Sequence, residues 1–344
     1  MPKQPLKVGL VGFGMVAERF HAPLISCEPA LQLRFVVERH RQRSQELYPQ
    51  VCVVRSLDEL LATSVDVVVV LTPNESHYEL ARKALLAGKH VVLDKPMTVT
   101  SKQADDLIAV ARTESLTLSV FHNRRWDSDY LTLRSLLREG ALGRVVELES
   151  RFDRFRPQPK GGWRESAGGG TGILYDLGSH LIDQALLLFG RPNRVFADIA
   201  VQRDGVEADD WFRVLLDYPQ TRVCLGASCL AAGPMTRFRV RGTEGTWLKH
   251  GLDRQESDLA EGRRPGEEGW GREIEESWGV CYGGSDARST PSVPGLYTEF
   301  YRLLAHSVQE GSEPPVTPGE GRDVIRVLEL CLESWGTGGW VGWS

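Results

Sequence analysis

Short apolar runs alternate with helical stretches over residues 6–120, and this alternation constrains the fold more than any other feature of the chain. Runs such as DVVVVLT at 66–72 are apolar almost throughout, as expected of a strand that is covered on both faces. Strand and helix in strict alternation predict parallel pairing with right-handed crossovers, and therefore a doubly wound parallel sheet. The expected strands are residues 6–13, 33–38, 51–54, 66–72, 89–94 and 116–121.

Capping residues mark several helix ends. Gly88 ends a predicted helix over 75–87, because glycine tolerates the left-handed conformation that is common after a helix. Ser56 and Glu59 have the spacing of a capping box. Thr317 and Glu320 have the same spacing, with a proline between them that suits the first turn of a helix.

From residue 121 the rhythm changes to longer segments in which apolar and polar residues alternate. This pattern predicts an open, largely antiparallel sheet with one covered face. A helix predicted over 128–137 leads into the expected strands, which lie within 144–155, 194–202, 210–218, 222–230 and 236–242. Helices over 173–189, 297–308 and 319–335 are expected to supply the cover. We therefore predict an α/β domain over 1–122 followed by an α+β domain over 123–344.

Composition excludes several classes of function. No apolar run reaches the roughly 18 residues of a membrane span, and the N-terminus lacks the apolar core of a signal peptide, so we expect a cytoplasmic protein. A net charge of −5 argues against a nucleic-acid partner. The six cysteines show no CxxC pair, which indicates reduced packing thiols and no structural metal site.

Residues 253–276 are charged and glycine-rich, and this composition predicts a solvated surface loop or mobile flap.

A glycine-rich loop follows the first predicted strand. Gly12, Gly14 and Ala17 have G-x-G-x-x-A spacing, and a helix is predicted directly after them. Such glycines allow a tight turn and let backbone N–H groups approach a pyrophosphate at the helix N-terminus. Between strand and helix, the motif predicts that residues 12–16 (Gly12, Phe13, Gly14, Met15 and Val16) bind a dinucleotide in a Rossmann domain.

The end of the second strand bears on the choice of dinucleotide. Glu38 lies 24 residues beyond Gly14, where a carboxylate can accept hydrogen bonds from the adenosine ribose of NAD. Arg39, Arg41 and Arg43 follow it, and an arginine in this place can pair with the 2′-phosphate of NADP. Because a carboxylate repels a 2′-phosphate, Glu38 favours NAD over NADP, while both remain open.

Polar residues also follow the fourth and fifth predicted strands, at the carboxyl edge where open parallel sheets bind ligands. After the fourth strand, residues expected to contact the dinucleotide are Thr72, Pro73, Asn74 and His77. The fifth strand leads into Asp94, Lys95 and Pro96, in which the proline restricts the turn and is a candidate for a cis peptide bond. We expect this turn to border the cofactor and Lys95 to point toward the nicotinamide.

The stretch TPNESHYELARKALLAGKHVVLDKP resembles the Gfo/Idh/MocA family of glucose-fructose oxidoreductases and inositol dehydrogenases, whose hallmark after this strand is Glu-Lys-Pro. Here the motif is Asp-Lys-Pro, which keeps the charge on a shorter side chain. FHNRRWD, WRESAGGG and YDLGSHLID extend the resemblance over nearly the whole chain. Within the family it is similar to the NADP-linked scyllo-inositol dehydrogenase branch, which opposes the preference for NAD inferred from Glu38.

YDLGSHLID places Asp176, His180 and Asp183 on one face of a predicted helix. Alcohol oxidation needs a base for the hydroxyl proton, and histidine suits this role because its ordinary pKa lies near neutrality. The resemblance implies catalytic roles for Lys95, Asp176 and His180, with Lys95 stabilising a developing alkoxide. Asp, His and Asp on one face would also suit a divalent ion, but no second histidine accompanies them, so no metal is expected.

Two further motifs suggest contacts with ligands. FHNRRWD is expected to place Asn123 near the nicotinamide carboxamide and Arg125 near the substrate, although Arg124 and Arg125 equally fit salt bridges that join the two domains. GGWRESAGGG fits either a mobile glycine loop or a flap in which Trp163 and Arg164 close over the nicotinamide side and exclude water. The resemblance favours closure.

Together these features predict an NAD(P)-dependent dehydrogenase that transfers a hydride between nicotinamide and a secondary alcohol carbon of a cyclic polyol or sugar. The expected substrate contacts are Lys95, Arg125, Asp176 and His180. The alternatives are a dinucleotide-binding sensor without turnover and a dehydrogenase of aromatic dihydrodiols. The resemblance also implies a homodimer or larger homo-oligomer, formed through the broad second-domain sheet.

Overall fold

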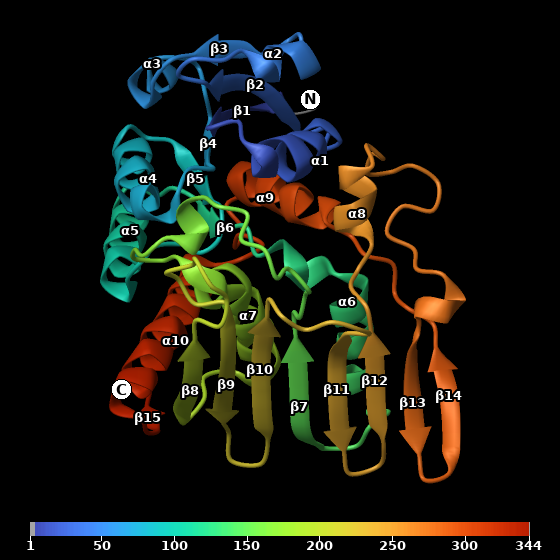
Figure 1. Ribbon diagram of the computed structural model, residues 1–344. Helices are drawn as coiled ribbons and strands as arrows, with labels where there is room; N and C mark the ends of the chain where they lie inside the picture. Colours follow the sequence, from blue (N-terminus) through green and yellow to red (C-terminus); the bar gives the residue numbers. More distant parts are fainter. Residues whose placement is uncertain (1–3, 344) are drawn as a thin grey trace. The chain divides into compact units, whose positions relative to one another are not determined.

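The computed structural model describes residues 4–343, in which the chain forms two compact units. The first unit contains the chain up to Asn123 together with two later segments, Gln255–Trp270 and Tyr297–Arg322. The second unit contains Arg124–Arg254, Gly271–Leu296 and the chain from Asp323 onward. Each unit is built around its own sheet (Figure 1).

The first unit has a six-stranded parallel sheet with the strand order β3-β2-β1-β4-β5-β6. This is the doubly wound Rossmann order, which reverses direction between β1 and β4. The residues of β4 are all fully buried, because helices cover both faces of a sheet of this kind. The strands are β1 Leu6–Val11, β2 Leu31–Val37, β3 Cys52–Val54, β4 Val67–Val70, β5 His90–Leu93 and β6 Leu118–Val120.

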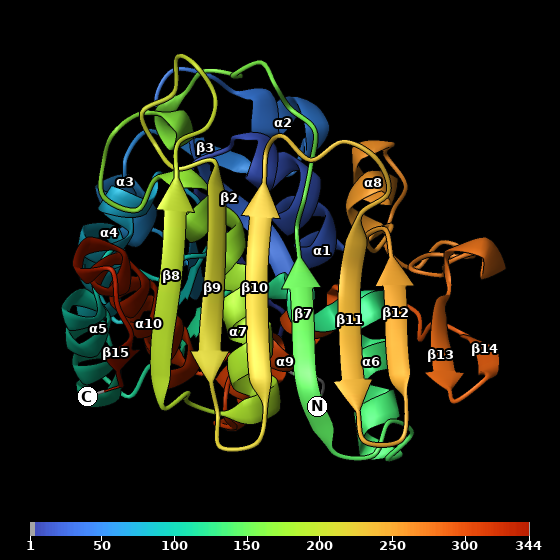
Figure 2. The same ribbon diagram turned by 60° about the horizontal axis from the view of Figure 1, so that its bottom comes forward.

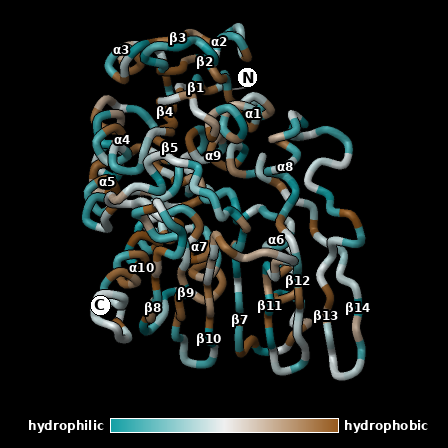
Figure 3. Tube along the Cα trace, in the orientation of Figure 1, coloured by the Kyte–Doolittle hydropathy of each residue, from teal (hydrophilic) through white to brown (hydrophobic). Residues whose placement is uncertain are grey.

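Helices α1 to α5 connect the strands of this sheet, as the sequence predicts, whereas α8 and α9 come from the later segments of the unit, although the sequence predicts α9 as cover for the second sheet. Ser56 caps α3 by accepting a hydrogen bond from the N–H of Glu59, and Thr100 and Gln103 form a capping box at α5. Hydrophilic and hydrophobic residues alternate along α4 and α5 (Figure 3), which is typical of helices that cover a sheet. The helical segments are a π-helical turn Ala17–His21, α1 Ala22–Ser26, α2 Arg43–Leu47, α3 Leu57–Leu61, a 3-10 turn Asn74–Ser76, α4 His77–Leu86, α5 Ser101–Thr113, α8 Gln255–Ala260 and α9 Thr298–Glu310.

The second unit has a nine-stranded sheet with the order β14-β13-β12-β11-β7-β10-β9-β8-β15. Its neighbouring strands pair antiparallel except β7 and β10, which are parallel, so the sheet is mixed but mostly antiparallel as predicted. The strands are β7 Val145–Arg151, β8 Arg194–Ala200, β9 Trp211–Asp217, β10 Arg222–Ser228, β11 Thr236–Gly242, β12 Thr246–His250, β13 Gly279–Gly283, β14 Asp286–Thr290 and β15 Val341–Gly342.

One face of this sheet is covered by helices. In β9, Phe212, Val214 and Leu216 are fully buried, whereas Leu215 between them is 37% exposed, as the alternating pattern predicts. Figure 2 shows α6 and α7 behind the sheet. The helical segments are a 3-10 turn Asn123–Trp126, α6 Ser128–Arg138, a 3-10 turn Trp163–Glu165, a π-helical turn Leu174–Gly178, α7 Ser179–Phe189, a 3-10 turn Glu275–Ser277 and α10 Pro318–Thr337, which begins in the first unit.

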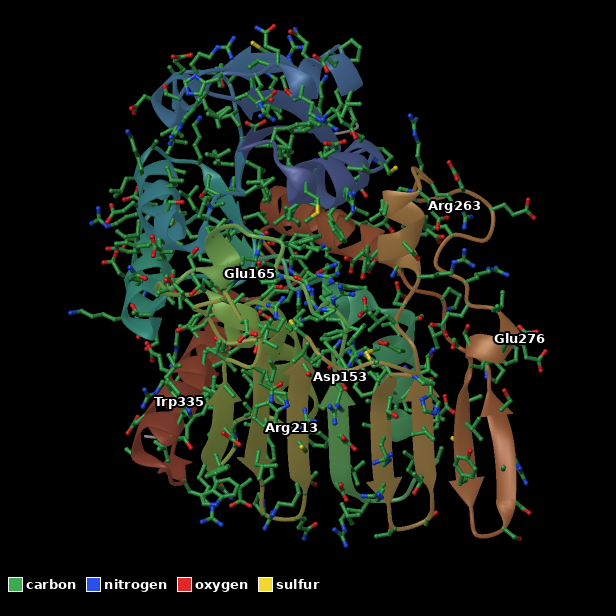
Figure 4. All side chains as sticks on the ribbon, in the orientation of Figure 1. Asp153, Glu165, Arg213, Arg263, Glu276 and Trp335 are labelled. Carbon is green, nitrogen blue, oxygen red and sulfur yellow. The ribbon has the colours of Figure 1, made fainter. Side chains whose placement is uncertain are left out.

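Most residues of 253–276 are exposed, as predicted, but the prediction of a loop is wrong for part of that segment. It contains α8, and Leu259 and Trp270 are buried in the first unit. Arg263 (Figure 4) donates hydrogen bonds to the Asp258 carboxylate and to a backbone carbonyl, and these bonds order the turn after the helix. Charged side chains that pair with one another and with the backbone can be ordered without a large apolar face, which composition alone does not reveal.

None of the helices in residues 4–343 combines the length and the apolar composition that crossing a bilayer demands.

Candidate functional site

The glycine loop joins β1 to a helical run that starts at Met15. Gly12 has φ of +99°, and a Cβ atom there would lie 3.2 Å from the carbonyl oxygen of Leu71, so this position requires glycine. A Cβ atom at Gly14 would meet nothing within 4 Å, and Met15 is 55% exposed. The loop therefore leaves open space above its backbone at the point where the strand order reverses, as a dinucleotide site requires.

Glu38 has a different environment from the predicted one. Its side chain is buried, and its two carboxylate oxygens accept hydrogen bonds from the backbone N–H groups of Arg43 and Ser44 at 3.2 and 3.0 Å. The Ser44 hydroxyl donates a further bond to the same carboxylate. Glu38 thus caps α2, because acidic groups satisfy the free N–H groups at a helix start. Arg39 is exposed, and Arg43 pairs with Glu18 at 2.7 Å.

The turns after β4 and β5 are neighbours because these two strands pair in parallel. In the first turn the Ser76 hydroxyl donates to Thr72 Oγ1 at 2.7 Å, Asn74 is buried, and Pro73 precedes the 3-10 turn. In the second turn Asp94 Oδ1 accepts a hydrogen bond from the Lys95 backbone N–H at 2.9 Å. The Lys95–Pro96 peptide bond is cis, and Lys95 is partly exposed.

His77 connects the two turns, and the expected contact between His77 and the dinucleotide needs correction. Its ring is fully buried, with Nδ1 3.0 Å from the carbonyl oxygen of Pro96 and Nε2 2.9 Å from that of Thr72. Burial lowers the pKa of this imidazole, while Asp94 and the bonded carbonyls raise it to a lesser degree. A ring closed off in this way supports the backbone of both turns and has no surface for a ligand.

The turn Asn123–Trp126 begins at Asn123 of the first unit, and its residues from Arg124 onward belong to the second unit and are attached to α7. Arg125 donates two hydrogen bonds to the Asp183 carboxylate, at 2.9 and 2.6 Å, and both side chains are buried. The Gln184 amide donates to the carbonyl oxygen of Arg124 at 2.8 Å. The side chains of Arg124 and Arg125 thus form ion pairs with Asp127 and Asp183 of the second unit, and Asn123 at the start of the turn is buried.

Asp176 and His180 lie on adjacent helical segments. Asp176 belongs to the π-helical turn Leu174–Gly178, so the α-helical spacing predicted for the whole stretch begins only at Ser179. His180 is 6% exposed, and the centroid of its ring lies 6.4 Å from that of Phe152, edge to face. His180 and Asp183 remain on one face of α7, three residues apart.

Two arginines flank Asp176, and the sequence analysis identified only one of them. Arg164 Nε lies 3.7 Å from Asp176 Oδ1, and Arg154 Nη2 lies 3.7 Å from Oδ2. The Arg164 guanidinium also stacks 4.5 Å above the Trp163 ring. Arg154 lies just beyond β7 in the sequence, and only the tertiary fold of the second unit brings it to Asp176.

The segment that carries Trp163 and Arg164 is anchored through its neighbour Glu165 (Figure 4). Glu165 pairs with the buried Arg203 at 3.0 Å, and Arg203 in turn bonds Asp210 at 2.8 Å. The flanking glycines Gly161, Gly162 and Gly170 all have positive φ. The turn Trp163–Glu165 is thus tied to Arg203 and lies between glycines in the left-handed conformation, an arrangement that the sequence motif does not reveal.

Asp209 is another residue that sequence reasoning missed. Its Oδ2 atom accepts a hydrogen bond of 2.7 Å from the backbone N–H of Leu174, at the start of the π-helical turn. Burial raises the pKa of this carboxyl from 3.8 to about 6, because its hydrogen bonds only partly offset the desolvation of the charged form. A Cβ atom at Gly172 would collide with the Asp209 side chain, so this contact also requires glycine.

Within residues 4–343, no group of three or more histidine, cysteine or acidic side chains has an arrangement that could hold a metal ion.

Comparison with known proteins identifies both units. Residues 6–122 match the model of the oxidoreductase family's NAD-binding Rossmann fold, and residues 134–342 match the model of its C-terminal alpha/beta domain. The chain belongs to the Gfo/Idh/MocA oxidoreductase family. The sequence-based recognition of this family is confirmed.

Relatives in this family cover almost the whole chain. The oxidoreductase YdgJ of Escherichia coli (strain K12) is 42% identical over 332 residues, which are 96% of each chain. The scyllo-inositol 2-dehydrogenase (NADP(+)) IolW of Bacillus subtilis (strain 168) is 38% identical over 334 residues, 96% of this chain and 93% of IolW. The solved structure of the oxidoreductase yvaA from Bacillus subtilis has a TM-score of 0.96, 36% identity and 99% coverage of both chains.

The cofactor of this Gfo/Idh/MocA protein is NAD(P), as predicted. The residues present fit it, since the positive φ of Gly12 and the open space at Gly14 leave the backbone of residues 12–16 free to approach a pyrophosphate. The Gfo/Idh/MocA family includes dehydrogenases that act on CH–OH groups.

Proposed function

We propose that this protein is an NADP-dependent dehydrogenase that oxidises a secondary hydroxyl group of a cyclic polyol or sugar, or reduces the corresponding ketone. The observation that carries the proposal is the turn Asp94–Pro96, which presents a lysine at the carboxyl edge of β5. The similarity of the whole chain to IolW, whose name specifies an NADP-linked scyllo-inositol dehydrogenase, supports the substrate class.

The environment of Glu38 supports NADP over NAD. A carboxylate that recognises the ribose of NAD must have an oxygen available to accept hydrogen bonds from the sugar hydroxyls. In Glu38 both oxygens already accept bonds from residues of the α2 start, and the side chain is buried. The exposed Arg39 beside it suits a 2′-phosphate, because a guanidinium can form paired hydrogen bonds with phosphate oxygens.

The proposed chemistry assigns one task to each side chain. When bound by residues such as those of the glycine loop, NAD(P)+ would supply the acceptor for the hydride of the carbinol carbon, so that oxidation of a secondary alcohol to a ketone would release one proton. The Lys95 ammonium donates a hydrogen bond to the reacting oxygen and stabilises negative charge on it. The His180 imidazole takes the hydroxyl proton, and returns it when the ketone is reduced. Asp176, held between Arg154 and Arg164, accepts a hydrogen bond from a substrate hydroxyl.

Arg125 is better suited to support than to substrate binding. Its guanidinium forms paired, buried hydrogen bonds with Asp183, one turn along α7 from His180. We therefore assign it the task of holding the turn Asn123–Trp126 against this helix.

Trp163 and Arg164 remain the residues that we expect to exclude water from the nicotinamide side. For homo-oligomer formation, we expect two copies to associate through the helix-free face of the nine-stranded sheet.

The proposal is tested by following absorbance at 340 nm with a panel of inositols and sugars, using NADP+ and NAD+ in turn. We expect turnover of at least one polyol with a higher kcat/KM for NADP+. Lys95→Ala and His180→Ala should each lower kcat by at least about a hundredfold, the scale of lost electrostatic or acid-base assistance. The exposed Lys102 and His250 provide matched controls, Lys102→Ala and His250→Ala.

Three results would contradict the proposal. Absence of turnover with every polyol and sugar, together with tight NADPH binding, would favour a sensor. Turnover of aromatic dihydrodiols alone would replace the substrate class. Near-normal kcat in folded Lys95→Ala or His180→Ala would remove the catalytic assignment of that residue.

A further inference from the structure

A buried histidine–tyrosine pair lies next to the Asp94–Pro96 turn, within the first unit. His21 ends the π-helical turn Ala17–His21, and Tyr301 belongs to α9. Both side chains are fully buried, and His21 Nδ1 lies 2.5 Å from the Tyr301 hydroxyl oxygen. The reaction proposed above assigns no role to either residue, although buried polar groups are costly and are usually retained for a specific purpose.

Burial determines the protonation states of the two side chains. Burial lowers the pKa of His21 to about 4, against a smaller opposing effect of Asp94, so the imidazole is neutral at physiological pH. Burial also raises the pKa of Tyr301 well above its ordinary value, so the phenol keeps its proton. With both groups neutral, the tautomer that places the ring proton of His21 on Nε2, 4.0 Å from the Asp94 carboxylate, is favoured electrostatically, and in this tautomer the Tyr301 O–H donates to Nδ1.

The Nε2–H group of His21 points toward Asp94. Nε2 lies 4.0 Å from Asp94 Oδ1, and no hydrogen-bond partner of this atom is found in residues 4–343. The same Asp94 oxygen accepts the Lys95 backbone N–H at 2.9 Å. The Phe121 ring packs against the imidazole with 4.2 Å between centroids, which restricts rotation of His21 away from this orientation.

A second buried imidazole holds the other end of the turn. His77 Nδ1 lies 3.0 Å from the carbonyl oxygen of Pro96. Buried imidazoles of the unit therefore lie on both sides of Lys95: His77 is within hydrogen-bond distance of the Pro96 carbonyl, and His21 Nε2 faces the Asp94 carboxylate at 4.0 Å. Such support matters in catalysis, because small misplacements of a reacting group lower the rate steeply.

We propose that His21 and Tyr301 are positioning residues that hold the Asp94 carboxylate, and through it the Lys95 backbone, in the arrangement required for turnover. This role rests on the proposed function of Lys95. Tyr301 fixes the tautomer of His21, the Nε2–H of His21 attracts the Asp94 carboxylate, and Asp94 holds the backbone N–H of Lys95. Neither His21 nor Tyr301 needs to touch a ligand.

The test uses Tyr301→Phe, which removes only a hydroxyl group, together with Asp94→Asn and the double variant. Tyr297→Phe is the matched control, because Tyr297 is equally buried and lies at the start of the same helix. Steady-state kinetics with the best polyol and NADP+ give kcat and KM. NADPH fluorescence titration and the melting temperature report whether the first unit remains folded and binds cofactor.

We expect Tyr301→Phe and Asp94→Asn each to lower kcat by about ten- to a hundredfold, with NADPH affinity within about twofold of wild type. The double variant should lose no more than the worse single variant, because the two changes interrupt one chain of interactions. Asp94→Glu should keep most of the wild-type kcat, since one further C–C bond of about 1.5 Å extends the carboxylate toward His21.

Several outcomes would overturn the inference. Unchanged kcat in Tyr301→Phe, an equal loss in Tyr297→Phe, or losses that multiply in the double variant would each refute a shared positioning role. A parallel loss of NADPH affinity and melting temperature would show a purely structural role. Absence of turnover by the wild-type protein would refute the proposed function itself, whereas wild-type turnover with unaffected variants would refute only the positioning role.

Discussion

The Asp209 carboxyl should make the stability of the second unit depend on pH in an unusual direction. Asp209 is only partly exposed, accepts a hydrogen bond from Leu174 N–H, and packs against Gly172. Its pKa is raised from 3.8 to about 6 by burial. The folded chain therefore holds this proton more tightly than the unfolded chain, and the resulting stabilisation is present below pH 3.8 and is lost as the pH rises through about 6.

The size of the effect follows from the pKa change. A pKa raised from 3.8 to about 6 corresponds to about 3 kcal/mol, at about 1.4 kcal/mol for each tenfold change in proton affinity. Asp209→Asn cannot titrate and resembles the protonated acid in shape. The free energy of unfolding of the variant should therefore increase relative to wild type by about 2 to 3 kcal/mol between pH 4 and pH 7.

The assay is urea denaturation of both proteins at a series of pH values, monitored by tryptophan fluorescence. The informative quantity is the pH dependence of the difference in free energy of unfolding between the two proteins. Any steric cost of asparagine cancels from it, because this cost is the same at each pH. Asp198→Asn, at an exposed position in β8, is the control. A difference that varies by less than about 1 kcal/mol, or that changes in the opposite direction, would refute the raised pKa and the argument from burial.

Two further predictions concern the glycine loop and α7. Gly12→Ala should lower the free energy of unfolding by about 1 to 3 kcal/mol through strain at positive φ. It should also weaken NADPH binding, because the new Cβ meets Leu71 O at 3.2 Å. Thermal denaturation measures the first effect and fluorescence titration the second, and an NADPH affinity equal to that of wild type would contradict the prediction. Asp183→Asn should lower the free energy of unfolding by about 3 to 5 kcal/mol, because it removes the carboxylate charge that faces the buried Arg125 guanidinium. A loss below about 1 kcal/mol in urea denaturation would show that the pair behaves as a surface ion pair.

Local patterns in the sequence predicted most of the architecture. The six strands of the first sheet and the helix-covered face of the second follow from apolar runs and from alternation. The capping residues Ser56 and Thr317 are confirmed by hydrogen bonds with the backbone N–H groups of Glu59 and Glu320. These features are predictable because periodicity and capping depend on residues within a few positions of one another.

Predictions about individual side chains were less complete. Glu38 follows the second strand as expected, but its carboxylate is used by Arg43 and Ser44 at the start of the next helix. His77 lies beside the expected turn, but its ring faces inward between two backbone carbonyls. Composition likewise misjudged residues 253–276, where Lys249 from a neighbouring strand pairs with the buried Glu273. In each case the partner that decides the role is absent from the motif.

By itself the sequence determined which segments form strands and helices, where a dinucleotide loop lies, and which family the chain resembles, because these depend on local spacing and short motifs. Only the tertiary structure decided which polar groups satisfy one another. Tyr301 reaches His21 across 280 residues of sequence, and Asp209 reaches Leu174 across 35. Hydrogen bonds and burial act over a few ångströms in space, and the distance along the chain places no constraint on them.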